Sequence, residues 1–491
     1  MNYEITNPDP SSLIEALRAL GYNLPTAIAD IVDNSITAQA KNIKINFHWA
    51  GKDSSISILD DGVGMSETEL SDAMRPGSRN PLDQRERSDL GRFGLGLKTA
   101  SFSQCRKLCV ASKTAGGCLC VRSWDLDYVT QTKEWRLRKE PTLAAEKILG
   151  ELSGENSWTL VVWNDLDRLV GNVSAHDPGA QSKFLYAADH VIEHLALTFH
   201  RFLENRVLSI LINKRELKPW NPFMETHDFT YQTPEERIPL GNSEVLFKGF
   251  ILPHKDHLSS EEYDLNGGPR GWNGEQGFFI YRNRRLLIHG DWLRLGSPNP
   301  LRREEQFKLA RIRLDLTNST DSEWQLDVKK STARPPSIIR ERLTDLAAAI
   351  RSQARGVFAH RGQYGPKSEP QTLERPWSPR KRNGQHVYLI DRAHPMVNGL
   401  MKKFNSAKPE IESLLRFLEE TVPVQQIWLD TAEQVQGQGI PYDGVDFENL
   451  RADMRILFEY LVQSGINAES ARQRLRAMEP WNRYRDLIGD L

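Results

Sequence analysis

The stretch that decides the fold covers residues 25–40 and reads PTAIADIVDNSITAQA. Its isoleucines and valine recur at helical spacing, which predicts a helix with one buried apolar stripe. Asp30 and Asn34 lie one turn apart on the other face, so their side chains point to the same side. A carboxylate there can orient and deprotonate a water, and a carboxamide oxygen can coordinate Mg²⁺. A surface helix with solvated acids is the alternative, and only the motifs downstream decide against it.

A second candidate site follows the predicted strand 54–59, which runs directly into DDGVGM at residues 60–65. An acid at a strand end, such as Asp60, can accept a hydrogen bond from an exocyclic amine. Gly62 and Gly64 would let the backbone approach a flat ring and adopt φ values closed to other residues. A turn with two glycines is common by chance, so this motif gains weight only in combination with others.

A glycine-rich stretch, GRFGLGLKTA, occupies residues 91–100 and follows a charged segment without periodicity at residues 75–88. Its glycines free backbone N–H groups to face phosphate oxygens, and the helix that begins there adds its positive end. Lys98 would supply a full positive charge. A Rossmann loop is the rival interpretation, but it requires a strand immediately before the glycines. The charged segment stands there instead, so we reject that interpretation.

The flanking segments predict an α+β domain. Ser66 and Glu69 form a capping box that predicts the start of another helix. Alternating apolar residues predict strands, and helical spacing predicts a helix that connects this domain to the next. The expected strands cover residues 41–49, 54–59, 107–113, 118–126 and 158–163, and the connecting helix covers residues 194–205.

The composition is that of an ordinary globular protein. The chain has 491 residues and a formal net charge of −1, and this length suggests roughly three domains. No run of ~20 apolar residues is present, so we expect no membrane-spanning helix. The polar start MNYEITNPDPSS is unlike a signal peptide, which makes the cytoplasm the expected compartment. The four cysteines lack the paired spacing of a zinc site, which favours reduced thiols.

Taken in order, these motifs resemble the GHKL ATPase superfamily, which includes DNA gyrase, MutL, MORC proteins, heat-shock chaperones and histidine kinases. DIVDN, DDGVGM and GRFGLGLK match its first three motifs. Trp158-Thr159 resembles the fourth motif, where the family usually has Gly-Thr. The resemblance covers roughly residues 11–163. It implies an α/β sandwich with a mixed sheet, a Mg²⁺-dependent ATPase activity, and ATP bound on the helical side.

The resemblance also implies a role for each site residue. Asp30 would be the general base, Asn34 would hold Mg²⁺, and Asp60 would bind the adenine amine. The other residues would shape the adenine pocket, support the adenine or form a lid over the phosphates. They are Gly62, Gly64, Met65, Gly91, Gly94, Leu95, Gly96, Leu97, Lys98 and Thr159.

One position departs from the family pattern. The general base of the family is usually Glu, whereas this chain has Asp30, whose carboxylate is withdrawn by about one C–C bond. A misplacement of ~1 Å can cost ~10²-fold in rate. We therefore expect slow turnover, and a nucleotide-binding scaffold with negligible hydrolysis stays open as the alternative.

The rest of the chain predicts two more domains joined by a linker. The strand-like segments after the connecting helix resemble the transducer domain of MutL, MORC and gyrase. That likeness implies that Lys330 returns to the γ-phosphate, with Lys329 as the alternative. A segment rich in Pro, Gly and charge is typical of a linker. The expected boundaries are residues 1–205 for the ATP-binding domain, 206–359 for the transducer-like domain, 360–385 for the linker and 386–491 for a mainly helical C-terminal domain.

Two apolar stripes at helical spacing occur in the C-terminal part. A core is the usual role of such stripes, and an exposed surface for a partner is the alternative. The first stripe is Leu414, Leu415 and Leu418, and the second is Phe447, Leu450, Met454, Leu457 and Leu461.

The whole layout resembles MORC- and MutL-like ATPases of bacterial anti-phage and restriction systems. It implies an ATP-gated conformational switch that acts on DNA as an ATP-dependent homodimer, with separate effector proteins and no membrane. A histidine kinase needs a phospho-acceptor domain ahead of the ATP domain, and only about two dozen residues precede the 25–40 helix. DRAHP at residues 391–395 is not the metal-nuclease motif of MutL, so we expect no nuclease.

Overall fold

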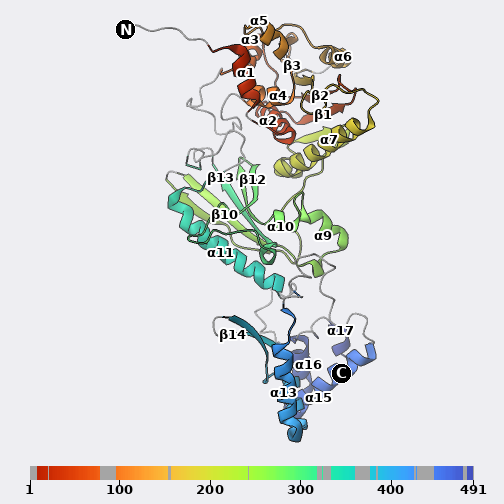
Figure 1. The fold of residues 1–491 in the computed structure, drawn as a ribbon, viewed down its shortest axis with the longest axis vertical. Helices are drawn as coiled ribbons and strands as arrows, with labels where there is room; N and C mark the ends of the chain where they lie inside the picture. Colours follow the sequence, from red (N-terminus) through yellow and green to blue (C-terminus); the bar gives the residue numbers. More distant parts are fainter. Residues whose placement is uncertain are drawn as a thin grey trace. The chain divides into compact units, whose positions relative to one another are not determined.

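The computed structural model divides the chain into two compact units, residues 1–366 and 367–491 (Figure 1). Among the helices that it describes, none is long and apolar enough to cross a bilayer. The residues that the structure describes are 8–19, 21–77, 96–152, 156–241, 243–317, 323–324, 333–359, 376–382, 385–424, 427, 447–478, 481 and 484–489.

The first unit begins with a mixed sheet of seven strands in the order β4-β3-β5-β2-β1-β6-β7. Strands β1 and β6 run parallel, and the other neighbours are antiparallel. The expected mixed α/β arrangement is therefore confirmed. The strands are β1 (Asn42–His48), β2 (Ser55–Asp60), β3 (Lys107–Lys113), β4 (Cys120–Asp125), β5 (Trp158–Asn164), β6 (Ser209–Ile212) and β7 (Arg215–Glu216).

Helices pack against both faces of this sheet, and most of them lie on one face, toward which β1 alternates its apolar side chains. In β1, Ile43, Ile45 and Phe47 are buried while their neighbours are exposed, and each such burial contributes roughly 1.5–3 kcal/mol. These side chains share one core with the layer of α1, α2, α4 and α7. The helices of this domain are α1 (Pro10–Arg18), α2 (Leu24–Thr37), α3 (Glu67–Met74), α4 (Gly96–Gln104), α5 (Leu126–Thr132), α6 (Leu143–Glu151), α7 (Pro178–Thr198) and α8 (His200–Glu204).

Local signals set the starts of two of these helices. The Asn23 side chain caps α2 by accepting a hydrogen bond from the Thr26 amide at 2.9 Å. Ser66 accepts a hydrogen bond from the Glu69 amide, and the Glu69 carboxylate accepts one from the Ser66 amide at 2.8 Å. The capping box expected at the start of α3 is therefore confirmed.

A second sheet follows in the same unit, in the order β12-β11-β13-β10-β8, with β9 paired to β10. The helical pattern of residues 337–359 predicts a helix, and α11 (Ser337–Ala359) has these bounds. It packs on β10 and β13 through one apolar stripe. Helices α9 (Ser260–Gly267) and α10 (Gly271–Gly274) lie in the chain between β10 and β11. Its strands are β8 (Tyr231–Gln232), β9 (Glu236–Leu240), β10 (Ser243–Ile251), β11 (Gly277–Arg282), β12 (Arg285–Asp291) and β13 (Ala310–Leu316).

The connection between the two sheets differs from the expectation. The structure has two helices where one connecting helix is expected over residues 194–205. Helix α7 begins earlier, at Pro178, and ends before Phe199, and α8 follows directly after Phe199. Strand β6 pairs with β1 in the first sheet, whereas the boundary expected from the sequence assigns everything from residue 206 to the second domain. Alternation predicts a strand, but pairing between distant segments decides which sheet the strand joins.

The second unit is mainly helical, as expected, but it opens with a hairpin. Strand β14 (Trp377–Arg382) pairs with β15 (Gln385–Ile390), so the last part of the expected linker is a strand. Both strands of an isolated hairpin are edges, where Pro379 is tolerated. The helices are α12 (Pro395–Lys403), α13 (Lys408–Glu420), α15 (Phe447–Gln463), α16 (Ala468–Arg476) and α17 (Arg485–Ile488).

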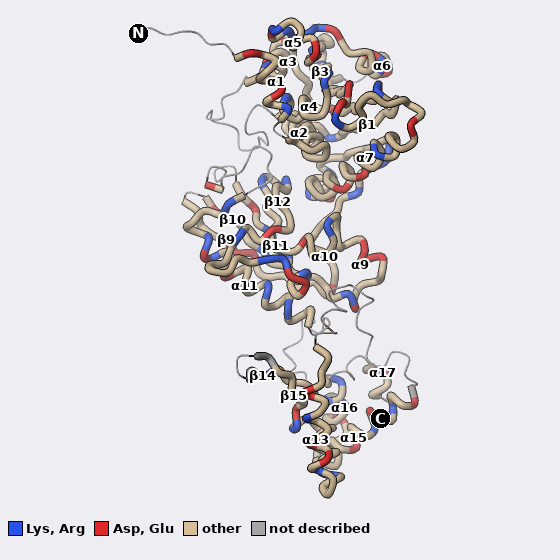
Figure 2. The backbone as a smooth tube through the Cα atoms, in the orientation of Figure 1, with Lys and Arg blue, Asp and Glu red and all other residues tan. Residues whose placement is uncertain are grey.

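The two apolar stripes of this unit have different surroundings. In α15, Leu450, Met454 and Leu457 are buried, which confirms a core for that stripe. In α13, Leu414 is 56% exposed and Leu418 is 44% exposed, so a core role for the first stripe is wrong in this structure. Acidic and basic residues are interspersed along the described chain (Figure 2), as its net charge of −1 leads one to expect.

Candidate functional site

Helix α2 brings Asp30 to the start of α4. The Asp30 side chain is buried, while Asn34, one turn further on, is exposed. A Cβ placed on Gly96, the first residue of α4, would lie 3.7 Å from Asp30 Oδ2. The start of a helix carries free N–H groups and the positive end of the helix dipole. The carboxylate of Asp30 therefore lies beside a position that favours an anion.

Strand β2 delivers Asp60 to the same side of the sheet. Its Oδ2 accepts a hydrogen bond from Ser35 Oγ of α2 at 2.7 Å, and its Oδ1 accepts one from the Gly62 amide at 3.0 Å. Burial raises the pKa of Asp60, although these two hydrogen bonds oppose the shift. Because Ser35 follows Asn34 in the chain, its hydrogen bond ties the Asp60 carboxylate to the helix that carries Asp30 and Asn34.

The adjacent acid, Asp61, has a separate structural role. Its Oδ1 accepts hydrogen bonds from the backbone amides of Lys41 and Asn42 at 2.7 and 2.8 Å. Partial burial opposes ionisation of Asp61, but the hydrogen bonds from Asn42 and Lys41 outweigh it and lower the pKa. Asp61 thus fastens the start of β1 to the end of β2, and Asp60 is left as the acid of the site.

The glycines of the DDGVGM turn are required by packing within the chain. A Cβ on Gly62 would lie 2.8 Å from the Ala38 carbonyl oxygen and 2.9 Å from Asp60 Oδ1. Gly64 has a φ of +71°, and a Cβ there would lie 2.0 Å from the Lys113 carbonyl oxygen. The sequence interpretation credited both glycines to the approach of a ring, whereas the structure shows an internal reason for each.

Gly64→Ala is expected to destabilise the protein by about 2–5 kcal/mol, since left-handed strain adds to the clash with Lys113. Gly116 offers a matched control, because it has a φ of +70° and a Cβ added there would meet no atom within 4 Å. Gly116→Ala should therefore cost only the strain, about 1–2 kcal/mol. Thermal melting of the two variants tests this, and equal melting temperatures would contradict the account.

Thr159 lies beside Asp60, because the two residues are directly paired between β5 and β2. Its hydroxyl lies 2.9 Å from Ser112 Oγ, which also accepts a hydrogen bond from the Met65 amide at 2.8 Å. Thr159 and Met65 are thus joined through Ser112. Sequence reasoning missed both Ser112 and Ser35 as polar partners, because a serine in a strand or helix carries no signal of what it will contact.

The glycine-rich stretch is described only from Gly96 onward, so Gly91, Gly94 and Leu95 lie outside the described residues. Leu97 packs against the core of the first domain. Lys98 is buried, and its Nζ donates a hydrogen bond to the Ala73 carbonyl at the end of α3, at 3.0 Å. The contact of this ammonium with phosphate oxygens, which the glycine-rich motif predicts, stays a prediction. Spacing in the sequence places a lysine on a helix but does not fix where its four-carbon stem points.

Lys329 and Lys330 also lie outside the described residues, so their expected role in contacting the γ-phosphate stays a prediction.

The structure adds one residue that the sequence did not indicate. Arg285, the first residue of β12, is 3% exposed, and its Nε lies 2.8 Å from both carboxylate oxygens of Asp33. Its Nη2 lies 3.8 Å from Asp30 Oδ1. A buried guanidinium is costly unless it is paired and hydrogen-bonded. The second sheet therefore reaches the acids of α2 through a fully buried ion pair.

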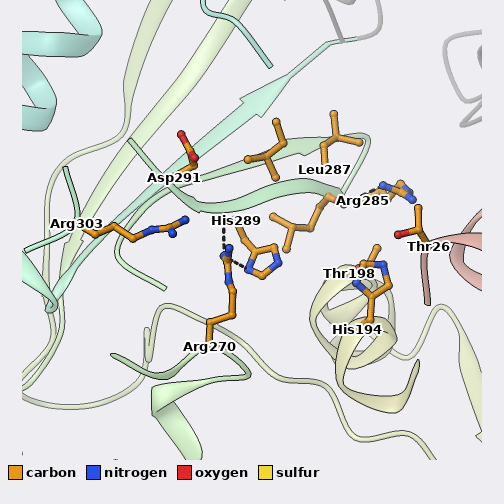
Figure 3. Close-up of a pocket in the computed structure, with 11 residues that line it drawn as sticks. Thr26, His194, Thr198, Arg270, Arg285, Leu287, His289, Asp291 and Arg303 are labelled. Carbon is orange, nitrogen blue, oxygen red and sulfur yellow. Dashed lines mark hydrogen bonds between the residues drawn. The ribbon is translucent and has the colours of Figure 1, made fainter. Parts of the chain in front are cut away.

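Arg285 also lines a pocket of about 240 Å³, which lies between β12 and α7 (Figure 3). Arg270 and Arg303 line it, but Arg270 pairs with buried Glu275 at 3.2 Å and Arg303 donates to the Gly290 carbonyl. Burial opposes ionisation of Glu275, yet His289 and Arg270 lower its pKa to about 2. The basic groups of this pocket are thus already engaged, and we assign it no ligand.

Comparison with known proteins finds a family model that matches the segment carrying this site. Residues 22–159 match the family described as "Histidine kinase-, DNA gyrase B-, and HSP90-like ATPase". That range contains α2, the DDGVGM turn, α4 and Thr159, so the GHKL resemblance inferred from the motifs is confirmed for this segment.

A particular relative is a curated MORC protein. The chain is 32% identical over 91 residues to "ATPase morc-1" of Caenorhabditis elegans. This stretch covers 18% of the present chain and 10% of that relative, so the match spans about a tenth of its length.

Proposed function

We propose that this chain binds ATP with Mg²⁺, hydrolyses it slowly, and changes the arrangement of its second domain with the nucleotide state. The observation that carries the proposal is the buried Asp60 carboxylate, held by Ser35 of α2 inside a segment that matches GHKL ATPases. The acids expected to bind adenine and to activate water are thereby tied to one helix.

Asp60 would recognise the base. A carboxylate fixed by Ser35 and Gly62 is already oriented, so little entropy is lost when it accepts a hydrogen bond from the exocyclic amine of adenine. Thr159, which pairs with Asp60 across the sheet, would support the same ring. Gly62 and Gly64 would shape the pocket by letting the turn pack closely against Ala38 and Lys113, where a Cβ would clash.

Asp30 would act on the water that attacks the γ-phosphate. Its Oδ2 faces the start of α4, where backbone N–H groups favour phosphate oxygens. The proton of the attacking water would pass to this carboxylate as the oxygen–phosphorus bond forms and the bond to ADP breaks. General bases of this kind contribute about 10²–10⁴-fold to the rate.

Asn34 fits a Mg²⁺ site, because its exposed side chain supplies an oxygen on the same helical face as Asp30. Mg²⁺ keeps several waters and commonly binds through one or two protein ligands together with substrate phosphates. When bound, the cation would neutralise phosphate charge. Lys330, or Lys329 instead, would contact the γ-phosphate, so that ATP and ADP favour different arrangements of the second domain.

We extend the proposal to an ATP-dependent homodimer that acts on DNA with partner proteins in bacterial anti-phage or restriction-type defence. The support is the motif resemblance and the partial match to a MORC protein. With a net charge of −1, binding to DNA would depend on a local basic groove and not on the whole surface.

A nucleotide-binding scaffold without hydrolysis is the second candidate, and the shorter Asp30 in place of Glu favours it. Phosphate release by the full chain with Mg²⁺, with and without duplex DNA, separates the two functions. Release under either condition supports the ATPase, and no release under both conditions would leave the scaffold.

ATP affinity is expected to fall as the pH is lowered through the raised pKa of Asp60. The ionised carboxylate is the form that accepts the amine, so binding is strongest above that pKa and is lost below it. Because the pKa is raised, the loss should begin at a higher pH than an ordinary aspartate would give. Calorimetric affinities at a series of pH values test this, with Asp60→Asn as the reference for titration of the nucleotide itself. An identical pH dependence in both proteins would contradict it.

A further inference from the structure

The second sheet contacts the first domain through buried, hydrogen-bonded side chains of α8. Arg201 forms hydrogen bonds with Asp315 of β13, and its guanidinium lies 3.5 Å from the ring centroid of Tyr281. His200 Nε2 lies 2.8 Å from the Tyr281 hydroxyl, and both of these residues are buried. Burial and satisfied hydrogen bonds hold the second sheet against the end of the first domain here.

Arg285 makes a second contact between the second sheet and the first domain. The turn that precedes Arg285 explains how this side chain reaches α2. Asn283 and Arg284 have φ values of 48° and 70°, so the β11–β12 hairpin closes in a two-residue turn with both central residues at positive φ. Such a turn makes a short, stiff hairpin end. Arg285 follows immediately and is buried, whereas Arg284 is exposed.

Helical geometry shows from which side Arg285 approaches Asp30. With about 100° per residue, Asn34 lies about 40° to one side of Asp30 and Asp33 lies about 60° to the other. Arg285 bonds Asp33 and touches Asp30 Oδ1, so it comes from the side away from Asn34. The other oxygen, Oδ2, is the one that faces Gly96 and α4.

We propose that Arg285 is a positioning residue for Asp30, supplied by the second domain. This inference rests on the proposed ATPase function. The guanidinium attracts Oδ1 of Asp30 and thereby orients Oδ2 of the same carboxylate toward the start of α4, where the attacking water would lie. Asp33 holds the guanidinium in place with both of its oxygens. A short aspartate thus gains a fixed orientation, and hydrolysis requires that the β11–β12 hairpin be docked on α2.

A planar guanidinium suits this arrangement better than an ammonium would. Its nitrogens are held in one plane, so one of them can bond Asp33 while another lies toward Asp30. A lysine keeps the charge but offers a single point of contact. Arg285→Lys should therefore retain part of the activity, and Arg285→Gln should retain least.

The test compares phosphate release and calorimetric ATP binding in the full chain and in three variants. Arg285→Gln is expected to lower kcat by about 10–10²-fold, the range for a misplaced catalytic group, while the ATP dissociation constant changes less than about threefold. Arg285→Lys should fall between Arg285→Gln and the parent. Arg284→Gln is the matched control, since it removes an exposed arginine from the same turn and should leave both quantities unchanged.

The double variant Arg285→Gln/Asp33→Asn separates positioning from stability, because it leaves no buried charge unpaired between these two residues. We expect it to melt near the parental temperature and still to show the low kcat. A parental kcat in this double variant would overturn the proposal, because Arg285 would then serve only to neutralise Asp33. A parental kcat in Arg285→Gln alone would overturn it as well.

A parent chain that binds ATP but releases no phosphate would overturn both this inference and the proposed hydrolysis. A parent that does not bind ATP would show that the proposed function itself is wrong.

Discussion

Asp60→Asn is expected to weaken ATP binding by about 10–10²-fold while the fold is retained. The charged hydrogen bond to the adenine amine is worth about 1.5–3 kcal/mol, and each 1.4 kcal/mol is a factor of about ten in affinity. An asparagine at this position keeps one acceptor oxygen, which can take the hydrogen bond from the Gly62 amide, and its NH2 group can donate to Ser35 Oγ, which rotates to accept. It loses the negative charge, and one of its two terminal groups becomes a donor. Titration calorimetry with an ATP analogue measures the loss.

Asp61→Asn is the matched control for this prediction. It changes the neighbouring acid in the same way, but Asp61 bonds the backbone at the start of β1 and does not face the site. We expect a lower melting temperature and unchanged ATP affinity. If Asp60→Asn bound ATP as tightly as the parent, the buried acid would not be the adenine contact.

Asp30→Asn is expected to lower kcat by about 10²–10⁴-fold, the contribution of a general base, while ATP still binds. The carboxamide has nearly the same shape as the carboxylate but cannot take a proton from water. Affinity should hold because the adenine contact at Asp60 and the helix start at Gly96 are unchanged. Single-turnover phosphate release measures the rate, and calorimetry measures the binding.

Asp72→Asn provides the control for charge removal, since Asp72 is an exposed acid of α3 that pairs only loosely with Arg75 at 3.5 Å. Its rate should equal that of the parent. Parental hydrolysis by Asp30→Asn would show that another group activates the water, and the α2 site would then be wrong in its main catalytic assignment.

Much of the fold could be predicted because its signals are local. The α2 stripe, the Ser66 capping box and the 337–359 helix each depend on residues within a few turns of one another, where periodicity and capping chemistry act directly. The same holds for Asp60, because an acid at the end of a strand is placed by the strand itself.

The parts that could not be predicted depend on contacts between distant segments. Strand β6 reads as an ordinary strand, and only its pairing with β1 puts it in the first sheet. Arg285 lies 252 residues from Asp33, and nothing in its neighbourhood distinguishes it from exposed Arg284. The hydrogen bond from Lys98 to the Ala73 carbonyl could not be predicted for another reason, because a long flexible side chain can satisfy its charge in several directions.

The most direct test of the account is a calorimetric titration of the full chain with a non-hydrolysable ATP analogue and Mg²⁺. We expect saturable heat with one nucleotide per chain, and an affinity about 10–10²-fold lower in Asp60→Asn. A parent titration with neither heat nor saturation would contradict the central claim that helix α2 and the Asp60 turn form a nucleotide site.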